Sequence, residues 1–129
     1  MNTPTPNPTC VQVYGIPNCD TVKKARTWLT EHGIAFEFHD FKKQGVSPAA
    51  LDHWLQTLDW ETVLNRKGTT WRKLDAATQA AVQDAASAKA VMLAHASVIK
   101  RPVVEWPSAQ GEAQVSVGFI APIWAKERL

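Results

Sequence analysis

The sequence predicts an α/β fold with one mixed four-stranded sheet whose strand order is interrupted by a helical insertion. Three observations lead to this: residues 10–41 have the pattern strand, helix, strand; the middle third is helical; and the last third has two strands and a helix. The 129 residues suffice for one ordinary domain but not for two, so residues 10–129 are expected to form a single domain. Residues 1–9 hold three prolines and almost no apolar side chains, which predicts a disordered N-terminal tail.

The first strand is expected over residues 10–14, where apolar side chains dominate, and a helix over residues 18–32. Val22, Ala25 and Leu29 recur at helical spacing and predict its buried face, and Gly33 predicts its end. Residues 34–41 alternate between apolar and polar side chains, which is typical of a strand. Since crossovers of this kind are right-handed, the two strands are expected to be parallel.

The middle third is expected to be helical because it is rich in helix-forming residues with clear start signals. Ser47 and Pro48 supply an N-cap and a first-turn proline, and Ser87 is expected to cap a second helix inside the alanine-rich stretch. The expected elements are a turn over residues 42–45, helices over 48–58 and 60–65, a loop over 66–70 and two helices within 75–96.

The last third returns to strand character. Residues 101–106 and 114–119 are expected to form a hairpin around a turn at residues 108–111. A final helix is expected over residues 122–129, with Ile123 and Trp124 as its large apolar contacts.

Composition excludes several classes of function. The formal net charge is only +2, so no large field favours nucleic acid or an anionic membrane as a partner. Apolar runs end well before about 18 residues and no export signal is visible, so the protein is expected to be cytoplasmic. The four histidines lack the spacing of metal ligands, so neither a metal nor a bound cofactor is expected.

Cys19 is the most informative residue, because it lies at the first turn of the helix that follows the first strand. Unpaired backbone N–H groups and the helix dipole favour a thiolate there, and a thiolate is nucleophilic. The alternative is a small buried hydrophobic residue. Cys10 is expected at the far start of the same strand, too far away for a disulfide with Cys19, and is expected to be structural.

Four separated segments resemble the ArsC/Spx (arsenate reductase-like) family, and within it the YffB-like branch. They are residues 14–25 (Y-G-I-P-N-C-D-T-V-K-K-A), 68–74 (G-T-T-W-R-K-L), 99–103 (I-K-R-P-V) and 117–119 (V-G-F). The resemblance covers nearly the whole chain outside the tail. It implies a thioredoxin-like fold with a helical insertion and makes Cys19 the nucleophile.

The resemblance also implies a set of anion-binding residues. Arg101 is expected to bind the anionic part of the substrate, and Pro102 to be a cis proline facing Cys19. A common pattern of the family has a second arginine directly before a glycine. Here the order is Arg66-Lys67-Gly68, so either Arg66 fills that position from one residue earlier or Lys67 replaces the arginine. Residues 114–119 carry no cation where arsenate reductases use a third arginine, so arsenate reduction is less expected.

Two further residues complete the predicted substrate site. Asn18 directly precedes Cys19 and is expected, with Asp20, to cap the helix. Lys23 lies four residues after Cys19, so it could face the sulfur or a bound carboxylate, although a solvated helix face is the more frequent position for a lysine.

The expected function is that of a glutathione-dependent thiol oxidoreductase with a single nucleophilic cysteine. Cys19-Asp20-Thr21-Val22 lacks a second cysteine, so the resolving thiol must come from outside, with glutathione as co-substrate. The substrate is expected to be a small anion or a disulfide. The alternative is a Spx-like transcriptional adaptor that binds a protein partner without turnover.

Overall fold

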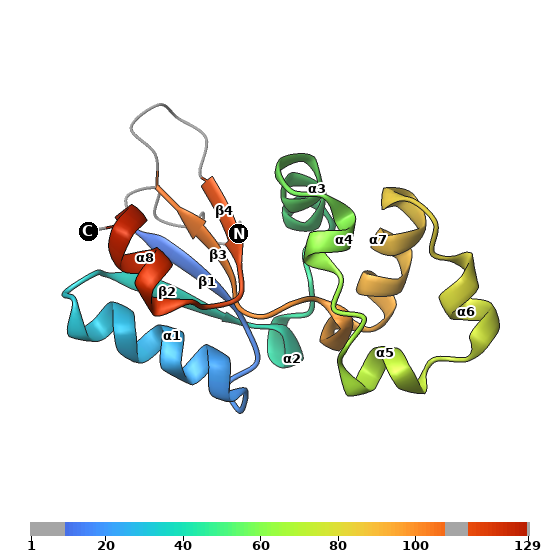
Figure 1. Ribbon diagram of the computed structural model, residues 1–129, viewed down its shortest axis with the longest axis horizontal. Coiled ribbons are helices and arrows are strands. Elements are labelled where there is room, and N and C mark those ends of the chain that lie inside the picture. The colour runs from blue at the N-terminus through green and yellow to red at the C-terminus, as the bar shows by residue number, and fades with distance from the viewer. Residues whose placement is uncertain (1–9, 108–113, 129) are drawn as a thin grey trace, which may run out of the picture. The chain divides into compact units, whose positions relative to one another are not determined.

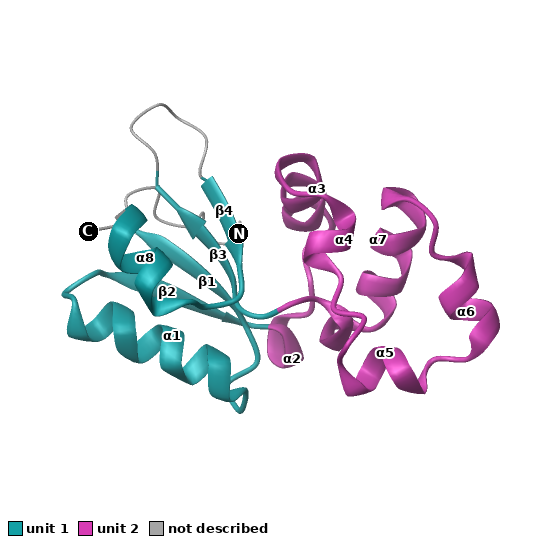
Figure 2. Ribbon diagram, viewed as in Figure 1, with its two compact units in different colours: residues 1–40, 101–129 teal, residues 41–100 magenta. Residues whose placement is uncertain are grey.

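The computed structural model describes residues 10–107 and 114–128, which fall into two compact units (Figures 1 and 2). The sheet unit comprises the described residues up to Asp40 and from Arg101 onward, and the helical unit comprises residues 41–100. The expected tail at residues 1–9 and the expected turn at 108–111 lie outside the described residues. The single domain over residues 10–129 stays a prediction.

The sheet unit is built on the predicted mixed four-stranded sheet, which is confirmed. Its strands are β1 (Val11–Gly15), β2 (Phe36–Asp40), β3 (Val103–Trp106) and β4 (Gln114–Val117), in the order β2-β1-β3-β4. Strands β1 and β2 are parallel, as predicted, whereas β1 with β3 and β3 with β4 are antiparallel.

Helix α1 (Asp20–Glu31) covers one face of the sheet. The predicted stripe of Val22, Ala25 and Leu29 is fully buried, which confirms the helical spacing. The helix ends at Glu31, and Gly33 has a φ of +67°, a left-handed conformation that glycine adopts without steric cost.

Helix α8 (Ala121–Arg128) covers the same face as α1 (Figure 1). Trp124 is 4% exposed and packs there, but Ile123 is 46% exposed, so the prediction that both side chains pack was wrong. Adjacent helical residues point about 100° apart, so only one of the two can face the sheet. The buried members of this core are Val11, Val13, Ala25, Trp28, Leu29, Val104, Trp106 and Trp124.

The helical unit contains short helices, as predicted for the middle third. They are α2 (Phe41–Gln44), α3 (Pro48–Thr57), α4 (Trp60–Val63), α5 (Thr69–Lys73), α6 (Ala76–Ala81), α7 (Ala85–Ala94) and the 3-10 helix η1 (Ala96–Val98). The N-cap at Ser47 is confirmed by its side chain, which accepts a hydrogen bond from the Ala50 amide at 3.3 Å.

Three local predictions in this unit were wrong. The expected turn at residues 42–45 is the helical turn α2, anchored by buried Phe41 and ended by Gly45 at a φ of +70°. The expected loop at 66–70 is shorter, because α5 already begins at Thr69. The helix break falls before Asp84, which is the N-cap of α7, while Ser87 completes a capping box three residues later with a 2.9 Å bond from its amide to Asp84.

Backbone hydrogen bonds join the segment after α4 to the end of the helical unit. The Asn65 amide donates to the Val98 carbonyl at 2.7 Å, and the Lys100 amide donates to the Val63 carbonyl at 2.8 Å. The Lys89 ammonium also lies 2.7 Å from the Asp52 carboxylate, linking α7 to α3. Side chains with no exposed surface in this unit are Leu51, Trp54, Val63, Ala88, Met92, Val98 and Ile99.

Among the helices that the structure describes, none combines the length and the apolar composition that crossing a bilayer would require.

Candidate active site

One end of the sheet brings together segments that are far apart in the sequence. Strand β1 ends at Gly15 and leads to Cys19, and β3 begins next to it because Tyr14 pairs with Val103 in antiparallel register. Residues 101–102, which precede β3, therefore lie at the same end of the sheet as residues 15–19. The Gly118 amide donates to the Pro102 carbonyl at 2.8 Å, which adds residues 118–119. We call residues 15–19, 101–102 and 118–119 the cysteine end of the sheet.

Cys19 is the N-cap residue of α1 and is half-buried. Its backbone is extended (φ −89°, ψ 126°), its carbonyl accepts from the Lys23 amide at 2.9 Å, and its side chain makes no capping hydrogen bond. The prediction that Asn18 or Asp20 caps the helix was wrong, because Asp20 is already helical and Asn18 lies outside it. The sulfur therefore lies at the positive end of the helix dipole, beside amides that lack intrahelical partners.

Gly15 allows the first turn of α1 to lie close to the end of β1. A Cβ atom at this position would be only 2.8 Å from Cγ2 of Val22, a separation that real Cβ atoms essentially never show. The absence of a side chain at Gly15 thus allows the start of the helix, and with it Cys19, to follow directly after the strand.

The peptide bond between Arg101 and Pro102 is cis, which confirms that part of the prediction. Pro102 is fully buried and Arg101 is half-buried. Both belong to the cysteine end of the sheet by the register of β1 and β3. Their action on a substrate stays a prediction.

Asn18 and Lys23, the other predicted site residues of the sheet unit, are both exposed. Asn18 lies in the connection between β1 and α1, directly before Cys19. Lys23 lies one helical turn after Cys19, so its ammonium is held on the same part of the surface by the helix.

Arg66 and Lys67 lie in the helical unit, in the turn before α5. The Arg66 guanidinium is paired with the Glu61 carboxylate at 3.0 Å and lies 5.7 Å from the centre of the Trp60 ring. The Lys67 backbone amide donates to Oδ1 of Asn65 at 3.1 Å, and within the described ranges the Lys67 ammonium makes no ion pair. Of the two predicted cations, Arg66 is thus the one whose charge is already balanced.

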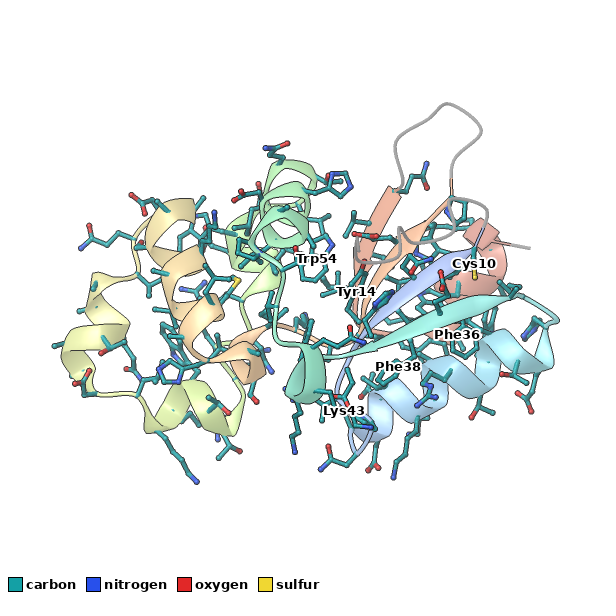
Figure 3. All side chains as sticks on the ribbon, turned by 180° about the vertical axis from the view of Figure 1, so that it is seen from behind. Cys10, Tyr14, Phe36, Phe38, Lys43 and Trp54 are labelled. Carbon is teal, nitrogen blue, oxygen red and sulfur yellow. The ribbon has the colours of Figure 1, made fainter. Side chains whose placement is uncertain are left out.

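Cys10 directly precedes β1 and so lies at the opposite end of that strand from Cys19. Figure 3 labels Cys10 and Tyr14, which mark the direction of β1. Five strand residues, spanning about 16 Å, separate the two cysteines, and both are free thiols. Partial burial, and then the Glu37 carboxylate, raise the pKa of the Cys10 thiol. Cys10 is therefore a poor nucleophile at neutral pH.

A polar network on the sheet face opposite the aromatic core was missed from the sequence. Gln12 is 4% exposed; its amide nitrogen donates to Glu37 at 2.9 Å, and its oxygen accepts from Nε2 of His39 at 2.6 Å. The His39 ring stacks on Tyr14 with centroids 4.4 Å apart. The alternation in β1 and β2 is the signal that places these four side chains on one face, whereas Phe36 and Phe38 lie toward α1 (Figure 3).

Tyr14 gives this network a testable pH dependence. Its hydroxyl donates to the Glu105 carboxylate at 3.1 Å, and burial, followed by the charge of Glu105, raises the pKa of Tyr14. A phenol whose pKa is raised by folding stabilises the fold below its unfolded pKa of about 10, and that stabilisation is lost as the pH rises further. We expect Tyr14→Phe to lower the free energy of unfolding by about 1 kcal/mol at pH 8 and by less near pH 11, measured by urea denaturation. A difference between the two proteins that does not change with pH would contradict this.

Within residues 10–107 and 114–128, no group of three or more His, Cys, Asp or Glu side chains is arranged to hold a metal ion.

Comparison with known proteins gives consistent matches. The chain matches the ArsC family over residues 14–122. A solved structure of the YffB protein is 47% identical in sequence, covers 90% of this chain and 96% of its own, and superposes with a TM-score of 0.81. An uncharacterised protein of Haemophilus influenzae is 37% identical over 94 residues, which are 73% of this chain and 82% of that protein. The global transcriptional regulator Spx of Streptococcus mutans is 29% identical over 70 residues, about half of each chain.

Proposed function

The chain belongs to the ArsC family, in its YffB-like branch, and on that basis we propose that it is a glutathione-dependent thiol oxidoreductase whose nucleophile is Cys19. The family and the thioredoxin-like fold were both predicted from the sequence, and both are confirmed. The observation that carries the proposal is the position of Cys19. Cys19 is half-buried and is the N-cap residue of α1, and its side chain makes no capping hydrogen bond, so the backbone amides at this helix end are available to an anionic group at the sulfur.

The proposed reaction has two exchange steps. In the first, the Cys19 thiolate attacks the glutathione sulfur of a mixed disulfide, the old S–S bond breaks, and the substrate leaves as a thiolate that takes a proton from water. In the second, a glutathione thiolate attacks the glutathione sulfur bound to Cys19, which releases oxidised glutathione and restores the Cys19 thiolate. Overall, the mixed disulfide and one glutathione thiol give the substrate thiol and oxidised glutathione: the substrate sulfur is reduced, the sulfur of the added glutathione is oxidised, and the glutathionyl sulfur stays in a disulfide throughout.

The cations near the site support anionic substrates. Arg101 belongs to the cysteine end of the sheet, and its planar guanidinium can bind a carboxylate through two hydrogen bonds. Asn18, Lys23 and Pro102 would line the same site. The co-substrate and this chemistry suit a reducing cytoplasm, which we propose as the location.

Arsenate is a less suitable substrate. Strand β4 and residues 118–119 after it carry no cation, so the third arginine that the resemblance associates with arsenate reductases has no counterpart there. A small oxyanion would therefore meet fewer positive charges than arsenate reduction requires.

A Spx-like adaptor is the second candidate, because the chain is similar to Spx over about half its length. An adaptor binds its partner stoichiometrically and needs no covalent chemistry at Cys19. Retention of the same partner by wild type and Cys19→Ser in a pull-down, together with no reductase activity, would favour it.

Labelling of the two thiols tests the enzyme proposal directly. We expect iodoacetamide at pH 7 to alkylate Cys19 at least about tenfold faster than Cys10, because Cys19 lies at the N-terminus of α1 whereas burial and the Glu37 carboxylate raise the pKa of Cys10. Oxidised glutathione should then place one glutathionyl group on Cys19, seen by peptide mass spectrometry, and reduced glutathione should remove it. Equal alkylation of both thiols, or an adduct confined to Cys10, would overturn the proposal.

A further inference from the structure

Two open grooves run along α1 in the sheet unit. The larger, of about 490 Å³, is lined by Lys23, Arg26, Thr27, Thr30, Glu31 and Phe36. The smaller, of about 370 Å³, is lined by Lys23, Lys24, Thr27, Trp28, Glu31 and Phe119. We call the smaller one the Phe119 groove.

The Phe119 groove shares one lining residue, Phe119, with the cysteine end of the sheet. Phe119 directly follows Gly118, whose amide bonds to Pro102, and Lys23 lies one helical turn after Cys19. In the larger groove, by contrast, the Arg26 guanidinium lies 4.2 Å from the centre of the Phe38 ring and is already engaged. A molecule bound to the sulfur of Cys19 would therefore continue most directly into the Phe119 groove.

The charges of the Phe119 groove are separated along its length. Lys23 and Lys24 lie near Cys19, and Glu31 is the last residue of α1. In the part of the chain that the structure describes, none of these three side chains makes an ion pair, so their charges are free to bind a ligand. With a rise of 1.5 Å per residue, Glu31 lies about 12 Å along the helix from Lys23 and about 18 Å from Cys19.

Aromatic rings line the middle of the groove. Trp28 and Phe119 meet edge to face with centroids 6.4 Å apart, and both contribute to its lining. The volume falls within the range of about 300 to 1,000 Å³ that is common for ligand sites. The groove thus presents two cations, an apolar middle and an anion, in that order from the cysteine.

We propose that the Phe119 groove binds the polypeptide that carries the disulfide attacked by Cys19, on one side of the cysteine in that disulfide, and selects a segment with an acidic residue near this cysteine, an apolar residue next and a basic residue at the far end. An extended chain covers about 12 Å in three or four residues, which matches the spacing of Lys23 and Glu31. Glutathione spans about 10 Å when extended, so it does not reach Glu31. This inference rests on the proposed function and names its substrate class: proteins or peptides with a disulfide-linked cysteine in such a segment.

Four peptides test the selection. Each carries a cysteine as a mixed disulfide with thionitrobenzoate, whose release is followed by absorbance: Cys-Glu-Leu-Ala-Lys, its charge-exchanged partner Cys-Lys-Leu-Ala-Glu, and the same two sequences in reverse chain direction. We expect the wild-type protein to react roughly three- to tenfold faster with the acid-proximal peptide, in at least one chain direction, in low salt. The preference should shrink at high ionic strength.

A charge-exchanged protein is the matched control. The double variant Lys24→Glu, Glu31→Lys keeps the net charge of the protein, but it neutralises the end of the groove near Cys19, where Lys23 remains, and makes the far end positive, so we expect it to reduce or invert the peptide preference. Equal rates for each peptide pair with the wild type, or an unchanged preference in the double variant, would overturn the inference.

Failure of this inference and failure of the proposed function give different results. If Cys19 releases thionitrobenzoate from every peptide without preference, the function holds and the groove proposal fails. If no release occurs, the function fails, and the groove is then tested by titrating peptides with serine in place of cysteine and following backbone amide shifts. Shifts at residues 23–31 that are larger for the acid-proximal serine peptide support the groove, and their absence overturns it.

Discussion

Replacing Cys19 with serine is expected to lower the rate of glutathione-dependent disulfide reduction by at least about a thousandfold, because no other nucleophile is available for the exchange. A hydroxyl at this position stays protonated at neutral pH and cannot form a mixed disulfide. The measurement is the rate of glutathione oxidation with a glutathionylated peptide as substrate, compared between wild type and Cys19→Ser at equal protein concentration.

The structure provides two controls for this result. Cys10→Ser should keep nearly full activity, since Cys10 lies at the other end of β1 and the pKa of its thiol is raised. Cys19→Ser should fold at least as well as wild type, because serine is a favoured N-cap residue and Cys19 makes no capping bond that could be lost. Residual activity above about a tenth of wild type in Cys19→Ser, with full loss in Cys10→Ser, would show that the wrong sulfur has been assigned.

The elements that the sequence predicted well are those with a strong local signal. The period of two in residues 34–41 and the spacing of Val22, Ala25 and Leu29 each follow from burial of one face, and both are confirmed. The parallel arrangement of β1 and β2 followed from the handedness of the crossover.

Helix starts were harder to predict because neighbouring residues compete for the same cap. Asp84 and Ser87 are both good N-cap residues, and only the capping box decides that Asp84 takes the cap and Ser87 the third helical position. In the same way, Asn18 and Asp20 are better caps than cysteine, yet the backbone turns helical at Asp20 and leaves Cys19 as the N-cap. Intrinsic preference is a weak guide where tertiary contacts fix the backbone.

The candidate site could be predicted only in part from sequence. The chemistry of Cys19 follows from its place after a strand, but the approach of residues 101–102 depends on strand order and on the pairing of Tyr14 with Val103, which local patterns do not contain. The ion pair between Arg66 and Glu61 likewise depends on the geometry of a turn. Side chains that meet through long-range pairing are thus the part that sequence patterns miss.

Trp124→Ala is expected to lower the free energy of unfolding by about 3 to 5 kcal/mol. The Trp124 ring is the large side chain by which α8 enters the core of the sheet unit, and it meets Trp106, Phe119 and Trp28 edge to face with centroids 4.8, 4.7 and 5.3 Å apart. Removing it leaves a cavity lined by three aromatic rings, of which Trp106 is held by β3 and Trp28 by α1. Thermal unfolding should show a decrease in Tm of roughly 10 to 20 °C.

Ile123→Ala is the matched control for this prediction, because it removes a large apolar side chain from the neighbouring position of the same helix. Ile123 is 46% exposed, so its loss should change the free energy of unfolding by less than about 1 kcal/mol, and alanine is the better helix former. Both variants change α8, but Trp124→Ala removes a side chain from its buried side and Ile123→Ala removes one from its exposed side. Similar destabilisation by both would mean that α8 is held by its whole surface rather than by Trp124, whereas a large effect of Trp124→Ala alone would show that one ring attaches the helix to the sheet.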